Sequence, residues 1–296
     1  MIGCGAVGSL FAANLGTLDD VEVWAYDPWQ AHVDAINANG LRLSGAGDVV
    51  GKVNATSDPA ALPPCELGIV AVKSMQTSEA IAVTAHAFGA VATVQNGAGN
   101  EELIAEHVRE VIRGTTFPAG HVIEPGHIGW DTRGDTHIGP FEPSPAPMMA
   151  VEALADACTR AGMPTHPLAD ARGAQWRKVI FNAASNAISA LTGRTHGQVA
   201  EPPTRELAWA VMAEGRAVAD AQGITLDMSP EELFDHAARK DVAYGHKPSM
   251  LQDVEAGRET EIDFLNGAIV AFGDRYGVEA PLNRALTQLV KGKEQV

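Results

Sequence analysis

Three glycines near the start of the chain have the spacing of a phosphate-binding turn. Gly3, Gly5 and Gly8 form G-x-G-x-x-G directly before a stretch with helical spacing. The first glycine allows a tight turn, the second lets the backbone approach a pyrophosphate, and the third lets helix and strand pack closely. The helix start adds unpaired N–H groups and a favourable dipole. Gly3, Gly5, Ala6, Val7 and Gly8 are therefore predicted to bind a dinucleotide.

An acidic residue at a suitable distance favours this interpretation. Asp27 lies 19 positions beyond Gly8, at the end of a predicted strand, Val21–Tyr26. A carboxylate at this point accepts hydrogen bonds from the hydroxyls of the adenosine ribose. The alternative is a tight strand-to-helix turn with an Asp present by chance. Two residues precede Gly3, whereas strands average about five, so we expect either a very short first strand or a chain that starts further upstream.

A second group of polar residues lies in the second half of the chain. Lys178, Asn182 and Asn186 are spaced four residues apart in a stretch with helical periodicity, so they share one helix face. Their neighbours are small and apolar, and burying such a stripe without partners is costly. Two interpretations are open: a solvated helix face, or the lining of a cleft that binds a polar ligand.

These residues are part of a wider pattern that resembles the ketopantoate reductase family, the 2-dehydropantoate 2-reductases. The resemblance implies a two-domain enzyme that reduces 2-dehydropantoate with NAD(P)H. Four motifs carry it over nearly the whole chain: the Gly3–Gly8 loop; Val72-Lys73-Ser74-Met75-Gln76-Thr77 followed by Gln95-Asn96-Gly97; Trp176-Arg177-Lys178 with Asn182 and Asn186; and Ser249-Met250-Leu251-Gln252-Asp253 followed by Thr260-Glu261-Ile262-Asp263 and Asn266-Gly267.

The resemblance also implies a role for each matching position. Lys178 corresponds to the catalytic lysine that protonates the carbonyl oxygen as hydride arrives, and Glu261 to the acidic residue that helps hold the substrate. By its position alone, Glu261 could instead be an exposed carboxylate at a helix N-terminus. The other positions bind ligands: Asn182, Asn186 and Ser249 the substrate, Asn96 the substrate and the nicotinamide, and Lys73 and Gln76 the cofactor.

The chain departs from the family at the end of the second strand. Members that use NADPH often have Ala-Arg-Gly there, whereas this chain has Ala25-Tyr26-Asp27-Pro28. A carboxylate repels a 2′-phosphate and accepts a bond from a free hydroxyl, so NAD(H) is favoured. Lys73 could still meet a 2′-phosphate, which leaves NADP(H) open. A different small 2-keto acid as substrate, or a non-catalytic dinucleotide sensor, are the alternative functions.

The hydrophobic pattern predicts an α/β Rossmann-type N-terminal domain followed by an all-α C-terminal domain. Residues 1–168 alternate short apolar runs with helical stretches and are predicted to bind the dinucleotide. Residues 169–296 show only helical spacing and are predicted to form the substrate and catalytic domain. The helices expected there are Ala174–Leu191, Thr204–Gln222, Glu231–Lys240, Ser249–Ala256, Glu261–Tyr276 and Pro281–Val290.

The composition excludes several other classes of protein. The formal net charge of −16 argues against nucleic acid or an anionic membrane as a partner. We find neither an apolar run long enough to span a membrane nor a signal-peptide pattern, and the three scattered cysteines suit a reducing cytoplasm. The histidines fit no common zinc spacing, so no metal is expected. The apolar stretch Ile262–Phe272 could face a second subunit in a homodimer.

Overall fold

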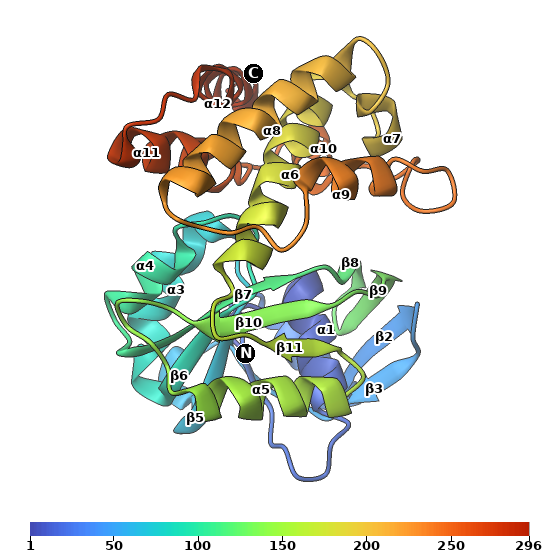
Figure 1. The fold of residues 1–296 in the computed structure, drawn as a ribbon. Helices are drawn as coiled ribbons and strands as arrows, with labels where there is room; N and C mark the ends of the chain where they lie inside the picture. The colour runs from blue at the N-terminus through green and yellow to red at the C-terminus, as the bar shows by residue number, and fades with distance from the viewer. Residues whose placement is uncertain (296) are drawn as a thin grey trace. The chain divides into compact units, whose positions relative to one another are not determined.

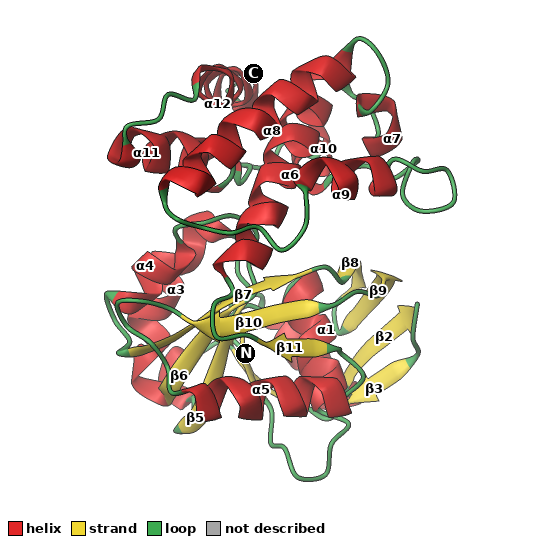
Figure 2. Cartoon of the chain, in the orientation of Figure 1, coloured by secondary structure: helices red, strands yellow, loops and turns green. Residues whose placement is uncertain are grey.

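The computed structural model describes residues 1–295, which divide into two compact units. The first contains residues 1–95 and 100–171; the second contains Asn96–Gly99 and the chain from Arg172 onward. Among the described residues, every strand belongs to the first unit, and the second is built of helices and loops (Figure 2). Four residues, Asn96–Gly99, therefore belong to the second unit although the chain on both sides of them belongs to the first.

The main sheet of the first unit is mostly parallel. Its five strands β5, β6, β7, β10 and β11 lie in the order β11-β10-β7-β6-β5, and only the β7–β10 pairing is antiparallel. Ile2 pairs with both Tyr26 and Val70 and so joins the β1–β4 pair to β5. A single residue thus stands where the first strand was expected. The strands are β1 (Trp24–Tyr26), β4 (Asn54–Thr56), β5 (Cys65–Val70), β6 (Phe88–Thr93), β7 (Glu110–Thr116), β10 (Thr136–Pro140) and β11 (Thr165–Pro167).

A second, four-stranded sheet has the order β3-β2-β9-β8. Its strands are β2 (Leu41–Gly45), β3 (Val49–Gly51), β8 (Ala119–Glu124) and β9 (His127–Thr132). The alternating pattern with glycine punctuation between Gly114 and Gly139 predicts antiparallel strands, and they are present as the β8–β9 hairpin and the β7–β10 pair. The parallel pairing of β9 with β2 was not expected, because it joins segments far apart in the sequence.

Helices cover both faces of the main sheet, because its strands are apolar on both sides. In β5 and β7, Ile69 and Ile112 belong to the core cluster that includes α1 and α5, whereas Val70 and Val111 belong to the cluster that includes α3 and α4. Successive residues thus point to opposite faces, as strand geometry requires. The helices are α1 (Ala6–Leu15), α2 (Gln30–Asn39), α3 (Thr77–Thr84), α4 (Asn100–Ala105) and α5 (Met148–Arg160) (Figure 1). The predicted Rossmann-type α/β class is confirmed.

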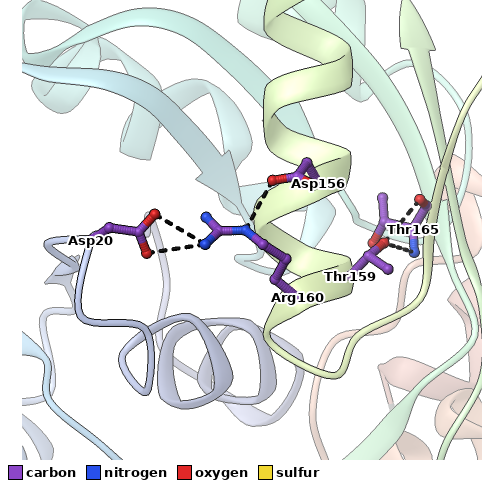
Figure 3. Close-up of polar contacts among 5 residues, drawn as sticks. All are labelled: Asp20, Asp156, Thr159, Arg160 and Thr165. Atoms are coloured by element: carbon purple, nitrogen blue, oxygen red, sulfur yellow. Dashed lines mark hydrogen bonds and ion pairs between the residues drawn. The ribbon is translucent and has the colours of Figure 1, made fainter.

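Polar contacts at the end of α5 attach it to neighbouring segments (Figure 3). Arg160 donates from Nη1 to the carboxylate of Asp20, at 3.0 and 3.1 Å, and from Nε to Asp156 one turn earlier, at 2.9 Å. The Thr159 hydroxyl accepts from the backbone N–H of Thr165 at 3.1 Å and donates to its carbonyl at 3.3 Å. The exposed ion pairs contribute about 1 kcal/mol or less each, so they add little to the stability of the fold.

The second unit is built around α6 (Arg172–Thr192), which packs against each of the other helices of the unit (Figure 1). Close approach is allowed by small, fully buried residues on this helix, such as Ala183, Ala184 and Ala187. The other helices are α7 (His196–Val199), α8 (Thr204–Ala221), α9 (Pro230–Ala237), α10 (Ser249–Glu255), α11 (Asn266–Tyr276) and α12 (Pro281–Glu294). The short helix α7 was not expected. Within residues 1–295, we find no helix that combines the length and apolarity a bilayer span requires.

One predicted helix, Glu261–Tyr276, is interrupted. Residues Ile262–Phe264 form a 3₁₀ turn, and α11 begins only at Asn266. The reason is that the Phe264 carbonyl accepts a hydrogen bond from Ala98 N at 2.9 Å and is not used within the helix. Ile262, Leu265 and Ile269 are buried in the core of their own unit, which removes the reason for expecting a dimer through this stretch. Homodimer formation stays a prediction.

Candidate active site

The glycine loop is shaped by contacts that admit no side chains. Gly3 has φ +83°, and a Cβ atom on Gly8 would lie 2.0 Å from the Gly3 carbonyl oxygen. Gly5 differs from both, since it is exposed and a Cβ there would meet nothing within 4 Å. Helix α1 begins at Ala6, and no side chain caps its first turn, which also includes Val7. Uncapped N–H groups beside an open glycine face fit a pyrophosphate group.

Asp27 holds the glycine loop directly. Its Oδ2 accepts from Cys4 N at 2.8 Å and its Oδ1 accepts from Trp29 N at 2.9 Å. An ionised carboxylate has about four acceptor positions, so two of them remain for ribose hydroxyls. Burial, and then the charges of Asp27, Glu79 and Asp58, raise the pKa of the neighbouring Tyr26. The end of β1 is therefore surrounded by negative charge.

The predicted cofactor residues Lys73 and Gln76 lie just beyond β5. Lys73 is partly buried and directly precedes the 3₁₀ turn Ser74–Gln76, in which Gln76 is exposed. Asn96 lies three residues beyond the end of the neighbouring parallel strand β6 and is partly buried. Ligands of open α/β sheets bind outside the carboxyl ends of the parallel strands, and both segments begin at such ends.

The polar stripe predicted on α6 is present and largely withdrawn from water. The side chains of Asn182 and Asn186 are 8% and 4% exposed, and Lys178 is partly buried. The interpretation as a solvated helix face is therefore wrong. Asn186 Oδ1 accepts a long hydrogen bond, 3.4 Å, from Met250 N in the first turn of α10. The Asn182 amide, by contrast, has no hydrogen-bond partner among residues 1–295.

Lys178 has the electrostatic character of a proton donor near neutral pH. Burial lowers the pKa of the Lys178 ammonium to about 8, although the negative charge of Glu261 acts in the opposite direction. Glu261 is 7% exposed, so the interpretation as an exposed carboxylate at a helix N-terminus is wrong. Ser249 is the first residue of α10 and its side chain is exposed. The second unit thus combines an ammonium of lowered pKa, a buried carboxylate and two buried amides.

Comparison with known proteins gives one consistent answer. Residues 1–143 match the family described as Ketopantoate reductase PanE/ApbA, and residues 170–294 match Ketopantoate reductase PanE/ApbA C terminal. The chain belongs to the ketopantoate reductase family. The resemblance drawn from the motifs is confirmed, and with it the class of NAD(P)-dependent oxidoreductases acting on a CH–OH group.

Relatives of the family cover the whole chain. A 2-dehydropantoate 2-reductase from Pyrococcus abyssi is 36% identical over 300 residues, which span 99% of this chain and 97% of that protein. The crystal structure of a PanE/ApbA family ketopantoate reductase from Ralstonia eutropha JMP134 has a TM-score of 0.87 and 33% identity, covering 99% and 97% of the two chains. A ternary structure of D-mandelate dehydrogenase with NADH and anilino(oxo)acetate has a TM-score of 0.88 and 26% identity, with the same coverage.

Membership of the family supports a nicotinamide dinucleotide as cofactor, and the relatives named 2-dehydropantoate 2-reductase act on a 2-keto acid. The open face of Gly5, the uncapped start of α1 and the carboxylate of Asp27 fit such a cofactor. The residues that could act on a carbonyl lie in the second unit, with Lys178 as the cation among them.

Four buried side chains that were not predicted as functional bond to one another close in sequence to the predicted ligand-binding residues Lys73 and Asn96. They are Ser74, Thr77, Gln95 and Asn100, which follow strands β5 and β6. Ser74, Thr77 and Gln95 stand inside the second motif, but their spacing in the sequence does not indicate that Thr77 and Gln95 are in contact. The only available signal was the presence of polar residues directly after two apolar strands.

Proposed function

We propose that this protein reduces 2-dehydropantoate to pantoate, with Lys178 as the general acid. The observation that carries the proposal is the pKa of Lys178, lowered to about 8 by burial, on a helix face shared with two buried amides. When bound, the reduced nicotinamide supplies the hydride. Lys178 Nζ stabilises the negative charge that grows on the carbonyl oxygen and donates the proton that completes the alcohol.

The remaining residues of the second unit hold the substrate and the proton. Glu261 raises the pKa of Lys178 and so keeps more of the lysine in the ammonium form that reduction requires. The Asn182 amide, which lacks a protein partner among the described residues, is available to a carboxylate or hydroxyl of the substrate. Asn186 and Ser249 flank the start of α10 and supply further polar contacts, and Asn96 binds both the substrate and the nicotinamide.

In this proposal the cofactor is held by the first unit and NADH is favoured over NADPH. Support comes from Asp27, whose carboxylate touches the glycine loop, and from the negative surroundings of Tyr26. A 2′-phosphate placed there would meet like charge. Gln76 and Lys73 contact the cofactor from the turn after β5, and Lys73 is the one predicted site residue that could favour NADPH. The ratio of kcat/KM for NADH over NADPH tests the preference, and a ratio well below one would contradict it.

Reduction of a different 2-keto acid is the second candidate, favoured by the likeness to D-mandelate dehydrogenase with NADH and anilino(oxo)acetate. A panel of 2-keto acids followed by NAD(P)H absorbance separates the two, because the physiological substrate should have the highest kcat/KM. A dinucleotide sensor would bind the cofactor and turn over none of the panel. We propose that the enzyme works in the cytoplasm, where its three free thiols, Cys4, Cys65 and Cys158, would stay reduced.

A further inference from the structure

A single buried hydroxyl joins the two segments that follow β5 and β6. Thr77 Oγ1 accepts a hydrogen bond from Gln95 Nε2 at 2.7 Å and donates one to Asn100 Oδ1 at 3.0 Å. Gln95 Nε2 also donates to the carbonyl of Val72 at 2.8 Å, and Asn100 Nδ2 donates to Ser74 Oγ at 3.2 Å. One hydroxyl can donate once and accept twice, so Thr77 serves both partners without conflict.

In the sequence, the two partners of Thr77 flank the segment Asn96–Gly99, which belongs to the second unit. Gln95 immediately precedes Asn96–Gly99 and Asn100 immediately follows it. Within the second unit the segment is held through its backbone, by Ala98 N to Phe264 O at 2.9 Å and by Gln175 Nε2 to Gly97 O at 3.2 Å. Thr77 therefore closes the base of the four-residue loop that carries Asn96.

The same hydroxyl lies close in sequence to Lys73. Thr77 begins α3, directly after the 3₁₀ turn Ser74–Gln76 that Lys73 precedes. The contacts from Val72 and Ser74 to Gln95 and Asn100 hold this turn against the base of the loop. Polar groups this deeply buried are costly unless they are paired, and here the pairing ties together two segments that each carry a predicted ligand-binding residue.

We propose that Thr77 is a positioning residue: its hydroxyl sets the geometry of the Asn96 loop and of the Lys73 turn for hydride transfer. The inference rests on the proposed function for its effect on turnover. The effect of Thr77 on the loop geometry does not depend on that function, because its hydrogen bonds join groups of the protein itself.

Helix α3 offers a matched control. Thr84 is 0% exposed, as Thr77 is, and lies at the other end of the same helix. Its hydroxyl donates only to the Ala80 carbonyl, at 2.7 Å. Thr77→Val and Thr84→Val thus remove the same atom from the same kind of environment, but only the first takes a hydrogen-bond partner from Gln95 and Asn100. Thr77→Ser keeps the hydroxyl and should restore the wild-type behaviour.

The experiment compares the three variants with the wild-type enzyme by hydrogen–deuterium exchange of residues 95–100, by the Kd for NADH and by kcat and KM for the 2-keto acid. For T77V we expect exchange at the Ala98 amide to rise, and kcat/KM to fall by on the order of tenfold or more. In the T84V and T77S variants, the exchange at the Ala98 amide and the kcat/KM should both match the wild-type values. If T77V does not fold, Thr77→Ala compared with Thr84→Ala gives the same test without added bulk.

Each outcome decides the inference. Equal exchange and equal kcat/KM in T77V and T84V would overturn it, and so would a loss in both variants that follows only a lowered Tm. If the wild-type enzyme reduces no 2-keto acid, the proposed function fails. The exchange of residues 95–100 and the Kd for NADH then still show whether Thr77 holds the loop.

Discussion

The two parts of the predicted site are built from different chemical groups. In the first unit, the glycine loop presents backbone N–H groups at the start of α1, and its shape depends on missing side chains. In the second unit, α6 presents side chains, Lys178 and Asn182, on a helix whose backbone groups are already bonded. A site made of backbone is damaged by adding atoms, whereas a site made of side chains is damaged by removing them.

This difference in chemical groups means that ligand binding and proton transfer are expected from different regions of the molecule. Backbone N–H groups do not ionise near neutral pH, so the glycine loop can bind and orient a ligand but cannot act as a general acid or base. Lys178, whose pKa is lowered to about 8, can do so. Substitutions in the two regions should therefore affect different measured quantities, and the following experiments test that expectation.

The largest effect is expected from Lys178→Ala. Loss of a general acid lowers kcat by about 10²–10⁴-fold, while the Kd for NADH should stay unchanged because the glycine loop is untouched. Lys293→Ala, which removes an exposed lysine of the same unit, is the control. Steady-state kinetics and NADH fluorescence titration measure both quantities. Turnover within a few-fold of wild type in K178A would refute the assignment of Lys178 as the acid.

Two glycine variants should separate folding from binding in the first unit. In Gly8→Ala the new Cβ meets the Gly3 carbonyl, so overpacking should cost about 1–3 kcal/mol of stability. Gly5→Ala meets no protein atom, so its Tm should stay at the wild-type value. Its affinity for NADH should still fall by roughly tenfold, about 1.4 kcal/mol, because the methyl group occupies the open face. Wild-type affinity in G5A would place the cofactor elsewhere.

The two amides of α6 should respond differently to truncation. In Asn182→Ala, KM for the 2-keto acid should rise by about tenfold, the value of a hydrogen bond to a charged group, with an unchanged Tm. In Asn186→Ala the acceptor for Met250 N is also lost, so Tm should fall by about 1–2 °C in addition to any change in KM. Thermal melts and substrate titrations of both variants give the comparison. A lowered Tm in N182A with wild-type KM would make Asn182 a structural residue.

The smallest expected effect is a shift in pH dependence. Reduction needs the ammonium form of Lys178, so kcat/KM should fall as the pH rises through about 8. Because the charge of Glu261 raises this pKa, Glu261→Gln should move the falling limb to lower pH. Oxidation of the 2-hydroxy acid needs the free amine and should show the opposite trend. If the falling limb of the pH profile of E261Q lies at the same pH as in the wild type, the charge of Glu261 does not act on the group that titrates.

Much of the fold could be predicted because its signals are local. The G-x-G-x-x-G spacing and the helical periodicity of the second half act over a few turns of chain, and both elements are present, as α1 and as α6 to α12. The same periodicity failed at residues 262–264, where the Phe264 carbonyl is bonded to Ala98, more than 160 positions away. Local spacing contains no information about such a partner.

The sequence by itself determined which residues share a face: the stripe of Lys178, Asn182 and Asn186 follows from helix geometry alone. Only the tertiary structure decided which of these are buried, which are bonded and how readily Lys178 loses its proton. It also decided that Thr77 meets Gln95 and Asn100. The physical reason is that desolvation and long-range hydrogen bonds depend on how distant segments pack together, whereas periodicity depends only on the geometry of one segment.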